Sequence, residues 1–235
     1  MQVRAFIEEM ERLAPPECAE DFDAGRIGLI VEGKMKISII CCALDATPAV
    51  VQHAVAAKAD MLVVHHTPLW TPVTSLTGAT ATLMREVLTN GLNIWVMHTN
   101  FDHAEAGVND ALGELLDLTN TEPLSLGLVG DCSLSLPEIA RRLGCPVRIW
   151  GKIRQPKRLA VVGGSGFDPV LMSEAKERGA DAFLSGELKH SVYRSAVLPC
   201  IEATHYALEA PAMRRLAARK GWQYIEDAPV LRTIP

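Results

Sequence analysis

The chain has 235 residues, of which 49% are hydrophobic and 22% are charged, and its formal net charge is −5. This composition is typical of a folded globular protein, and the negative charge disfavours generic nucleic-acid binding, because neutralising phosphates requires a positive field. The first residues contain no apolar run that resembles a signal peptide or a membrane span, so we expect a cytoplasmic protein with no membrane partner.

The first half of the chain predicts alternating helices and strands. Apolar positions recur at helical spacing from Val3 to Leu13, and Pro15-Pro16 makes continuation of that helix difficult. Thr47-Pro48 has the form of an N-cap followed by proline in the first turn. The same signals predict strands over 27–31 and 37–44 and helices over 47–57 and 83–90.

Two continuous apolar runs in this half end in polar residues. Met61–Val64 predicts a strand that is buried on both faces, and it stops at His65-His66. Ile94–Met97 predicts a second such strand, and it runs into His98 and, four residues later, Asp102. In open α/β sheets ligand-binding groups gather at the carboxyl ends of strands, so both positions favour a functional site.

The second half repeats this order. A strand over 158–162, a glycine-rich turn and a helix over 170–178 precede another buried strand, which ends at Glu187. A helix over 191–197 and a strand over 200–203 then lead to His205 and Glu209, whose spacing matches that of His98 and Asp102. Ala180-Asp181 likewise repeats Ala59-Asp60 before a buried strand, which indicates an ancient duplication.

Turn residues between Leu118 and Leu134 predict the boundary between the two halves. Ser135 and Glu138 form a capping-box pattern that begins the second half with its own helix. We therefore predict an α/β fold of two related α/β lobes, residues 1–125 and 126–235, with the functional site between them.

Histidine and carboxylate side chains after these strands supply nitrogen and oxygen donors, which suit zinc, manganese, iron or nickel and commonly form paired metal sites. The six cysteines include no Cys-x-x-Cys pair and favour reduced core thiols, so a metal must find other ligands. His65 and His66 can share a site only where the backbone leaves the strand, because neighbouring side chains of a strand point to opposite faces. Thr67-Pro68 makes that departure plausible.

Each candidate also has a structural alternative. His65-His66 could be packed core histidines, and Asp102 could be a turn residue or the cap of a helix that begins near Val108. His205 and Glu209 could be a core histidine and a helix-start carboxylate, because Pro211 fits only the first turn of a following helix.

Six motifs in matching order resemble the GTP cyclohydrolase I, type 2 family, also described as the Nif-three-like dinuclear metal proteins. These motifs are His65-His66-Thr67-Pro68-Leu69, His98-Thr99-Asn100-Phe101-Asp102, Gly107-Val108-Asn109-Asp110, Gly163-Gly164-Ser165-Gly166, Ser185-Gly186-Glu187, and His205-Tyr206 with Glu209. The resemblance covers nearly the whole chain. Two motifs depart from it: the usual Trp-Asp-Asn signature is Phe22-Asp23-Ala24 here, and the glycine before the late histidine is Thr204.

The resemblance implies two divalent metal ions per chain, with Glu209 suited to bridge them. The implied metal ligands are His65, His66, Asp102, His205 and Glu209. The family is also similar in forming a ring-like hexamer, so the resemblance implies a homo-oligomer. Longer relatives carry an inserted domain, and the interval from Leu118 to Leu134 is too short for an inserted third domain.

The implied activity is a metal-dependent hydrolase that acts on a small molecule, GTP or another nucleotide, and opens the purine imidazole ring. Glu187 and His98 are candidate catalytic residues, and Glu187 alternatively is a turn acid. Gly163, Gly164, Ser165 and Gly166 are candidate substrate-binding residues through their N–H groups, or else form only a tight turn. A metal carrier, a regulatory ring-shaped scaffold without turnover, and a phosphate-ester hydrolase remain as alternative functions.

Overall fold

The computed structural model describes residues 1–232, and these residues form two compact α/β units. The first unit contains residues 1–104 and 213–232, and the second unit contains residues 105–212. The predicted lobes, 1–125 and 126–235, differ from this division at both ends. Residues 105–125 lie in the second unit, and the last part of the chain returns to the first.

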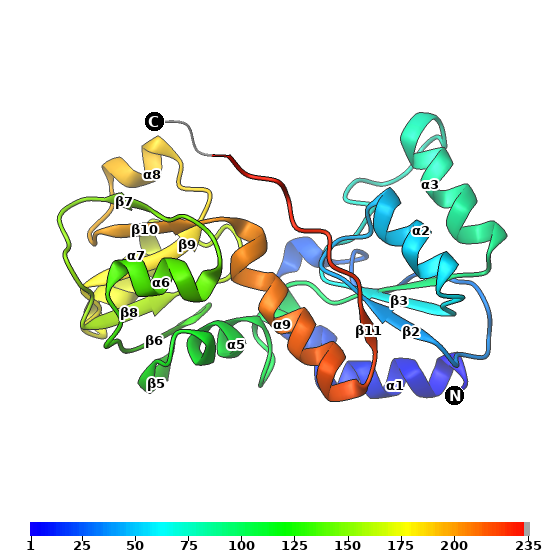
Figure 1. Ribbon diagram of the computed structural model, residues 1–235, viewed down its shortest axis with the longest axis horizontal. Coiled ribbons are helices and arrows are strands. Elements are labelled where there is room, and N and C mark those ends of the chain that lie inside the picture. The colour runs from blue at the N-terminus through cyan, green and yellow to red at the C-terminus, as the bar shows by residue number, and fades with distance from the viewer. Residues whose placement is uncertain (233–235) are drawn as a thin grey trace. The chain divides into compact units, whose positions relative to one another are not determined.

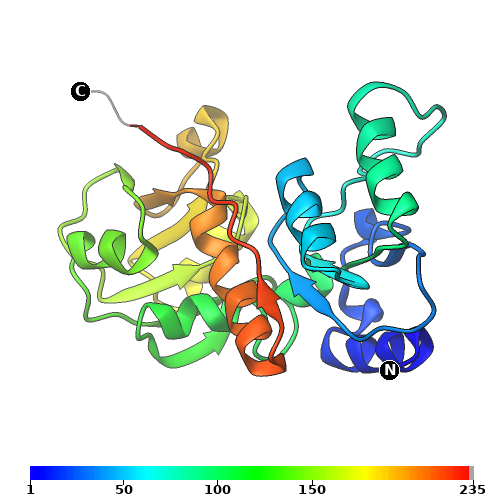
Figure 2. The same ribbon diagram turned by 45° about the vertical axis from the view of Figure 1, so that its right-hand side comes forward.

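The first unit is built on a five-stranded sheet with the strand order β1-β4-β3-β2-β11. All neighbours are parallel except β1, which pairs antiparallel with β4. Figures 1 and 2 show the C-terminal strand β11 beside β2, which explains why the end of the chain belongs to this unit. Its strands are β1 (Gly28–Val31), β2 (Ile40–Cys42), β3 (Met61–Val64), β4 (Asn93–Val96) and β11 (Gln223–Tyr224).

Helices cover both faces of the first sheet. Apolar residues of α2 and α3 pack on one face, and Figure 1 shows α2 and α1 on opposite sides of β2 and β3. On the second face, Phe6 of α1 packs edge-to-face against Trp95 of β4, with ring centroids 5.7 Å apart. The helices and 3-10 turns of this unit are α1 (Val3–Leu13), η1 (Pro16–Cys18), η2 (Asp21–Asp23), α2 (Pro48–Ala56), α3 (Gly78–Thr89) and α4 (Thr99–Asp102).

The second unit is built on a six-stranded mixed sheet with the order β5-β6-β8-β9-β10-β7. Successive residues of β8 alternate between two cores: Leu159 and Val161 pack with α5, α6 and the start of α9, whereas Ala160 packs with α7. The strands are β5 (Thr119–Pro123), β6 (Leu128–Asp131), β7 (Arg148–Trp150), β8 (Arg158–Val161), β9 (Ala182–Gly186) and β10 (Cys200–Ala203). The helices are α5 (Val108–Leu115), α6 (Leu136–Leu143), α7 (Pro169–Glu177), α8 (His190–Arg194) and α9 (His205–Lys220), whose second half lies in the first unit.

The two units share the connection that leads into their buried strands. Asp60, just before β3, accepts hydrogen bonds from two backbone N–H groups that precede β2, at 2.9 and 3.2 Å. Asp181, just before β9, accepts in the same way from two N–H groups at the start of β8, at 3.0 and 3.2 Å. Each aspartate therefore joins the starts of two parallel strands, which gives a physical basis for the repeated Ala-Asp pair.

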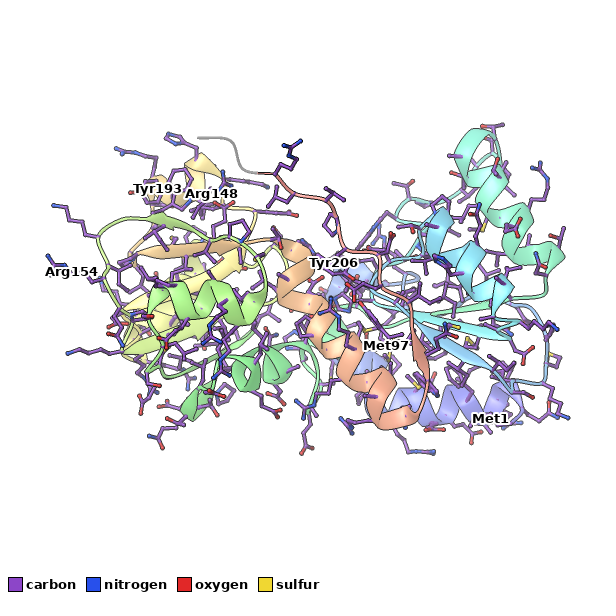
Figure 3. All side chains as sticks on the ribbon, in the orientation of Figure 1. Met1, Met97, Arg148, Arg154, Tyr193 and Tyr206 are labelled. Atoms are coloured by element: carbon purple, nitrogen blue, oxygen red, sulfur yellow. The ribbon has the colours of Figure 1, made fainter. Side chains whose placement is uncertain are left out.

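Several edge elements of the second unit were not predicted. The interval predicted as a boundary contains the β5–β6 pair, and all five residues of β5 are exposed. The strand β7 also lies at an edge, where Glu202 of β10 accepts hydrogen bonds from Arg148 at 2.5 Å and from Trp150 at 2.9 Å. Tyr193, labelled with Arg148 in Figure 3, packs against the Trp150 ring at 5.1 Å. The strand β7 is thus stabilised by contacts with residues distant in sequence, which local periodicity does not report.

The predicted capping box is confirmed, because the Ser135 backbone N–H donates to Glu138 at 2.8 Å. The position predicted for Pro211 is wrong. The helix α9 already begins at His205, so Pro211 lies inside it rather than in the first turn. No helix within residues 1–232 has both the length and the apolar character needed to cross a membrane.

Candidate metal centre

Three histidines of the first unit gather at the carboxyl ends of β3 and β4. His65 and His66 follow β3, and His98 follows β4, its parallel neighbour. The ring centroid of His65 lies 4.8 Å from that of His66 and 5.1 Å from that of His98. One ring nitrogen from each of the three lies within 4.8 Å of the others, which is a spacing that a metal ion could bridge.

The backbone leaves the strand at the histidine pair, as the sequence analysis requires. The N–H groups of His65 and His66 both donate to the carbonyl oxygen of Leu44, at 3.0 and 3.1 Å. In a regular strand, successive N–H groups point in opposite directions, so this shared acceptor marks the end of the pleat. The two imidazoles can therefore lie on the same side of the sheet edge.

Carboxylates hold two of these rings at Nδ1. Asp45 lies 2.7 Å from Nδ1 of His66, and Asp23 lies 2.9 Å from Nδ1 of His98. A carboxylate at Nδ1 favours the tautomer with its proton there, and this tautomer leaves the Nε2 lone pair for a metal ion. Carboxylate–histidine pairs of this kind are typical of metal sites in proteins.

Asp23 is fully buried and accepts more than one hydrogen bond. Besides His98, the backbone N–H of Thr99 donates to it at 3.0 Å, and the Thr99 hydroxyl donates to the same oxygen. Burial alone would raise the pKa of Asp23, but the hydrogen bonds from His98 and Thr99 outweigh it and hold the pKa below its usual value. The sequence did not predict a role in the site for Asp23 or Asp45, and the Phe22-Asp23-Ala24 signature was the available signal for the first.

Asp102 supplies a carboxylate to the same cluster. The short helix α4 follows His98, and the N–H of Asp102 donates to the His98 carbonyl at 3.1 Å. Its Oδ1 lies 3.6 Å from Nε2 of His65, which is completely buried. The residues His65, His66, His98 and Asp102 are called the first donor set below.

The second unit contains its own pair of donors, His205 and Glu209, called the second donor set below. Both lie on the first turn and a half of α9, four residues apart, and Nε2 of His205 lies 3.0 Å from Oε2 of Glu209. Glu209 is only 3% exposed. The carboxylate of Glu187 lies 3.0 Å from Nδ1 of His205, so this histidine is held in the same way as His66 and His98.

The glycine-rich turn lies against the second donor set. Gly164 has φ of 59°, and a Cβ placed there would lie 2.1 Å from Oε1 of Glu209 and 3.1 Å from Nε2 of His205. The N–H groups of Gly163 and Gly166 donate to the side chains of Asn109 and Ser185, both at 2.8 Å. The turn thus brings backbone close to the donors, and anion binding by Gly163, Gly164, Ser165 and Gly166 stays a prediction.

The donor chemistry fits a transition metal. Imidazole nitrogen and carboxylate oxygen together suit zinc, iron, manganese or nickel. Cys41 and Cys42 are buried in β2, and burial raises the pKa of both thiols, which disfavours the thiolate form that binds a metal. Groups that could hold a metal ion are therefore present among the described residues.

Known proteins with similar sequences carry related names. A "GTP cyclohydrolase 1 type 2 homolog" from Pyrococcus horikoshii is 34% identical over 212 residues, which cover 83% of this chain and 84% of the relative. A relative of the same name from Methanocaldococcus jannaschii is 31% identical over 229 residues, covering 92% of this chain and 93% of the relative.

Solved structures have the same fold. "Reduced HcgD from Methanocaldococcus jannaschii" superposes with a TM-score of 0.81 at 28% identity, covering 95% of this chain and 96% of that one. A Bacillus cereus protein related to NIF3 has a TM-score of 0.83 at 17% identity and covers 99% of both chains, which shows the fold alone. The Duf34/NIF3 (NGG1p interacting factor 3) family matches residues 1–223, and the chain belongs to this family.

Proposed function

We propose that this protein is a dinuclear metal-dependent hydrolase in which the two donor sets serve one pair of divalent ions. The ligands in this proposal are His65, His66, Asp102, His205 and Glu209. The observation that carries it is the pairing of three histidines with carboxylates at Nδ1, in both units. Packed core histidines have no need of this repeated arrangement, whereas metal-binding histidines commonly have it.

The residues of the chain have separate tasks in the proposal. Asp45 and Glu187 fix the tautomers of His66 and His205, so that each Nε2 is available as a ligand. His98, held by Asp23, presents its Nε2 beside these ligands and can donate or accept a proton at the substrate. A bound pair of divalent ions supplies the Lewis acidity that activates water near neutral pH.

The names of the relatives suggest GTP as the substrate. In that reaction, water attacks the imidazole carbon that lies between the two ring nitrogens. Both carbon–nitrogen bonds break as two waters are consumed, the nitrogens take up protons, and the carbon leaves as formate. The ring-opened product retains the pyrimidine, the ribose and the triphosphate.

Formate release from GTP tests this reaction. Protein loaded separately with manganese, zinc, iron and nickel should release formate with at least one metal and none after chelation. Glu209→Gln should reduce the rate far more than His53→Ala, which changes a histidine of α2 outside both donor sets. No formate from protein whose bound metal has been measured would contradict the cyclohydrolase proposal.

A metal carrier or partner-binding scaffold is the second candidate, because the family description itself refers to an interacting factor. Such a protein would use the same donors without turnover. Rapid exchange of bound metal with a competing chelator, together with no product from a panel of nucleotides analysed by mass spectrometry, would favour this candidate over the hydrolase.

A further inference from the structure

A cavity of about 510 Å³ lies in the first unit, next to the first donor set. Its walls come from residues 24–26, from Leu29 and Ile30 of β1, and from the loop residues 69–73. The volume is within the range of about 300–1,000 Å³ that small-molecule sites usually have. Neither the metal ligands nor the glycine-rich turn accounts for it.

Two of these wall segments lie against His98 or against its partner Asp23. Asp23, which holds His98, immediately precedes the wall, and its carbonyl accepts a hydrogen bond from the Arg26 N–H at 2.8 Å. On the other side, Trp70 packs edge-to-face against His98, with ring centroids 5.1 Å apart. A molecule in the cavity would therefore lie within one side chain of the first donor set.

The walls are mostly apolar and include an exposed aromatic ring. Leu29, Leu69, Pro72 and Val73 line the cavity together with Trp70. Trp70 and Val73 are each 44% exposed, although covering a tryptophan ring would remove a large apolar area from water. An exposed aromatic side chain in a concave wall is typical of a surface that a ligand covers.

Among the described residues that line the cavity, Arg26 carries the only charge. Its Nε donates to the Trp70 carbonyl at 2.7 Å, which fixes the plane of the guanidinium at the wall. The remaining Nη groups of a guanidinium form a fork that matches a carboxylate or a phosphate. A positive fork and an aromatic ring in one pocket match a ligand with a planar ring and a negative group.

We propose that this cavity binds a planar aromatic anion, with the ring against Trp70 and the negative group at Arg26. If this anion is the substrate of the metal centre, the proposal also rests on the proposed function. The shared chemistry is a ring and an anion, and either a nucleotide phosphate or a heteroaromatic carboxylate could supply it.

Binding of matched probes to the full chain tests this proposal. Guanosine monophosphate and indole-2-carboxylate each combine a ring with an anion, and guanosine, indole and ribose 5-phosphate each lack one part. Calorimetric titration should show saturable binding of at least one of the first two, about tenfold or more tighter than its incomplete counterparts. The better of the two complete probes identifies the source of the anion.

Variants locate the site. Trp70→Ala and Arg26→Gln should each weaken binding about tenfold, whereas Leu76→Ala, on the same loop but outside the wall, and Arg12→Gln, on α1, should leave it unchanged. No saturable binding, equal binding of complete and incomplete probes, or binding that neither wall variant changes would overturn the proposal. A change in oligomeric state with Trp70→Ala, without ligand binding, would overturn it in favour of a contact between copies.

Titrations before and after chelation, with metal content measured on the same samples, separate this proposal from the proposed function. Ligand binding by protein that takes up no metal would contradict the proposed metal centre and leave the ligand-binding proposal intact. Metal uptake without ligand binding would contradict the ligand-binding proposal and leave the metal centre intact.

Discussion

His66, His98 and His205 each have a carboxylate at Nδ1, and replacing these carboxylates tests their role in the site. Asp45→Asn should weaken metal binding about 10–100-fold, because an amide stabilises the metal-ligating tautomer of His66 less well than the carboxylate does. Asp23→Asn acts on His98, which is not a ligand in this proposal, so it should lower turnover and leave metal binding unchanged. Competition with a chelator of known affinity measures the loss. Asp21→Asn, an exposed neighbour of Asp23, is the matched control and should bind metal like the wild type. Equal affinity for all three variants would contradict the positioning role.

Glu187 separates two roles that the site allows. If it transfers a proton, Glu187→Gln should retain the metal while turnover falls about 10²–10⁴-fold. Its contact with His205 instead predicts a positioning role, in which metal affinity falls together with the rate. We expect the second result. Metal analysis and kinetics on one preparation decide between them, and a rate loss at full metal content would contradict us.

The close approach of Gly164 to Glu209 predicts that no side chain fits at position 164 without moving Glu209. Gly164→Ala places a methyl group 2.1 Å from the Glu209 carboxylate, so Glu209 must move and metal affinity should fall. Gly144→Ala is the control, because Gly144 also has positive φ, of 68°, and a Cβ there meets nothing within 4 Å. Both variants should lose about 1 kcal/mol of stability from backbone strain, but only Gly164→Ala should lose metal. Equal metal loss in both variants would contradict this account.

Local spacing identified the loops of the site but not their supporting residues. His65 and His66 follow a buried strand directly, so the pattern of apolar residues locates them. Asp23 reaches His98 across 75 positions of the sequence, and no local periodicity reports such a contact. The resemblance supplied the only signal for it, and that signal was weakened by Phe22 and Ala24 at the neighbouring positions.

At the scale of elements, Asp60 joins β2 and β3 at their starts. Burial would raise its pKa, but hydrogen bonds from Lys34 and two backbone N–H groups outweigh burial and lower the pKa. Asp60→Asn should therefore cost about 1–3 kcal/mol of unfolding free energy near neutral pH, because charged hydrogen bonds are lost. Urea unfolding measures the change, and Glu11→Gln, an exposed carboxylate on α1, is the control.

The pH dependence of this effect follows from the lowered pKa. A carboxyl group whose pKa is lower in the folded state stabilises the protein fully above its unfolded pKa, about 3.9, and the stabilisation is lost as pH falls through the folded pKa. The difference between wild type and Asp60→Asn should therefore shrink as the pH falls below about 4. A difference that stays constant over this range would show that packing, and not charge, is responsible.

The buried parallel strands were predictable because their sequences are continuous apolar runs. β3 has this form and was found at its observed bounds. The edge strand β5 is exposed throughout and has no apolar pattern, and the edge strand β7 pairs with β10, which is distant in sequence. The strand predicted over 37–44 is only Ile40–Cys42 in the structure. Before it, the N–H of Ile37 donates to the Met1 carbonyl, and those of Ser38 and Ile39 donate to the Asp60 carboxylate rather than to a strand.

At the scale of the whole molecule, the family resemblance implies a homohexamer, and we propose this assembly for the chain. Light scattering should then give a mass six times the 25.5 kDa of one chain, independent of dilution over the micromolar range. A single-chain mass at all concentrations would contradict the hexamer and leave the donor sets unaffected.

Metal content per chain is the most direct test of the central claim, which is that donors from both units hold one pair of ions. Elemental analysis of metal-loaded, desalted protein should find about two divalent ions per chain. His65→Ala and Glu209→Ala, each changing one donor set, should both lose metal while circular dichroism confirms that they are folded. Wild-type protein that retains no metal, or folded variants whose metal content equals that of the wild type, would contradict the account.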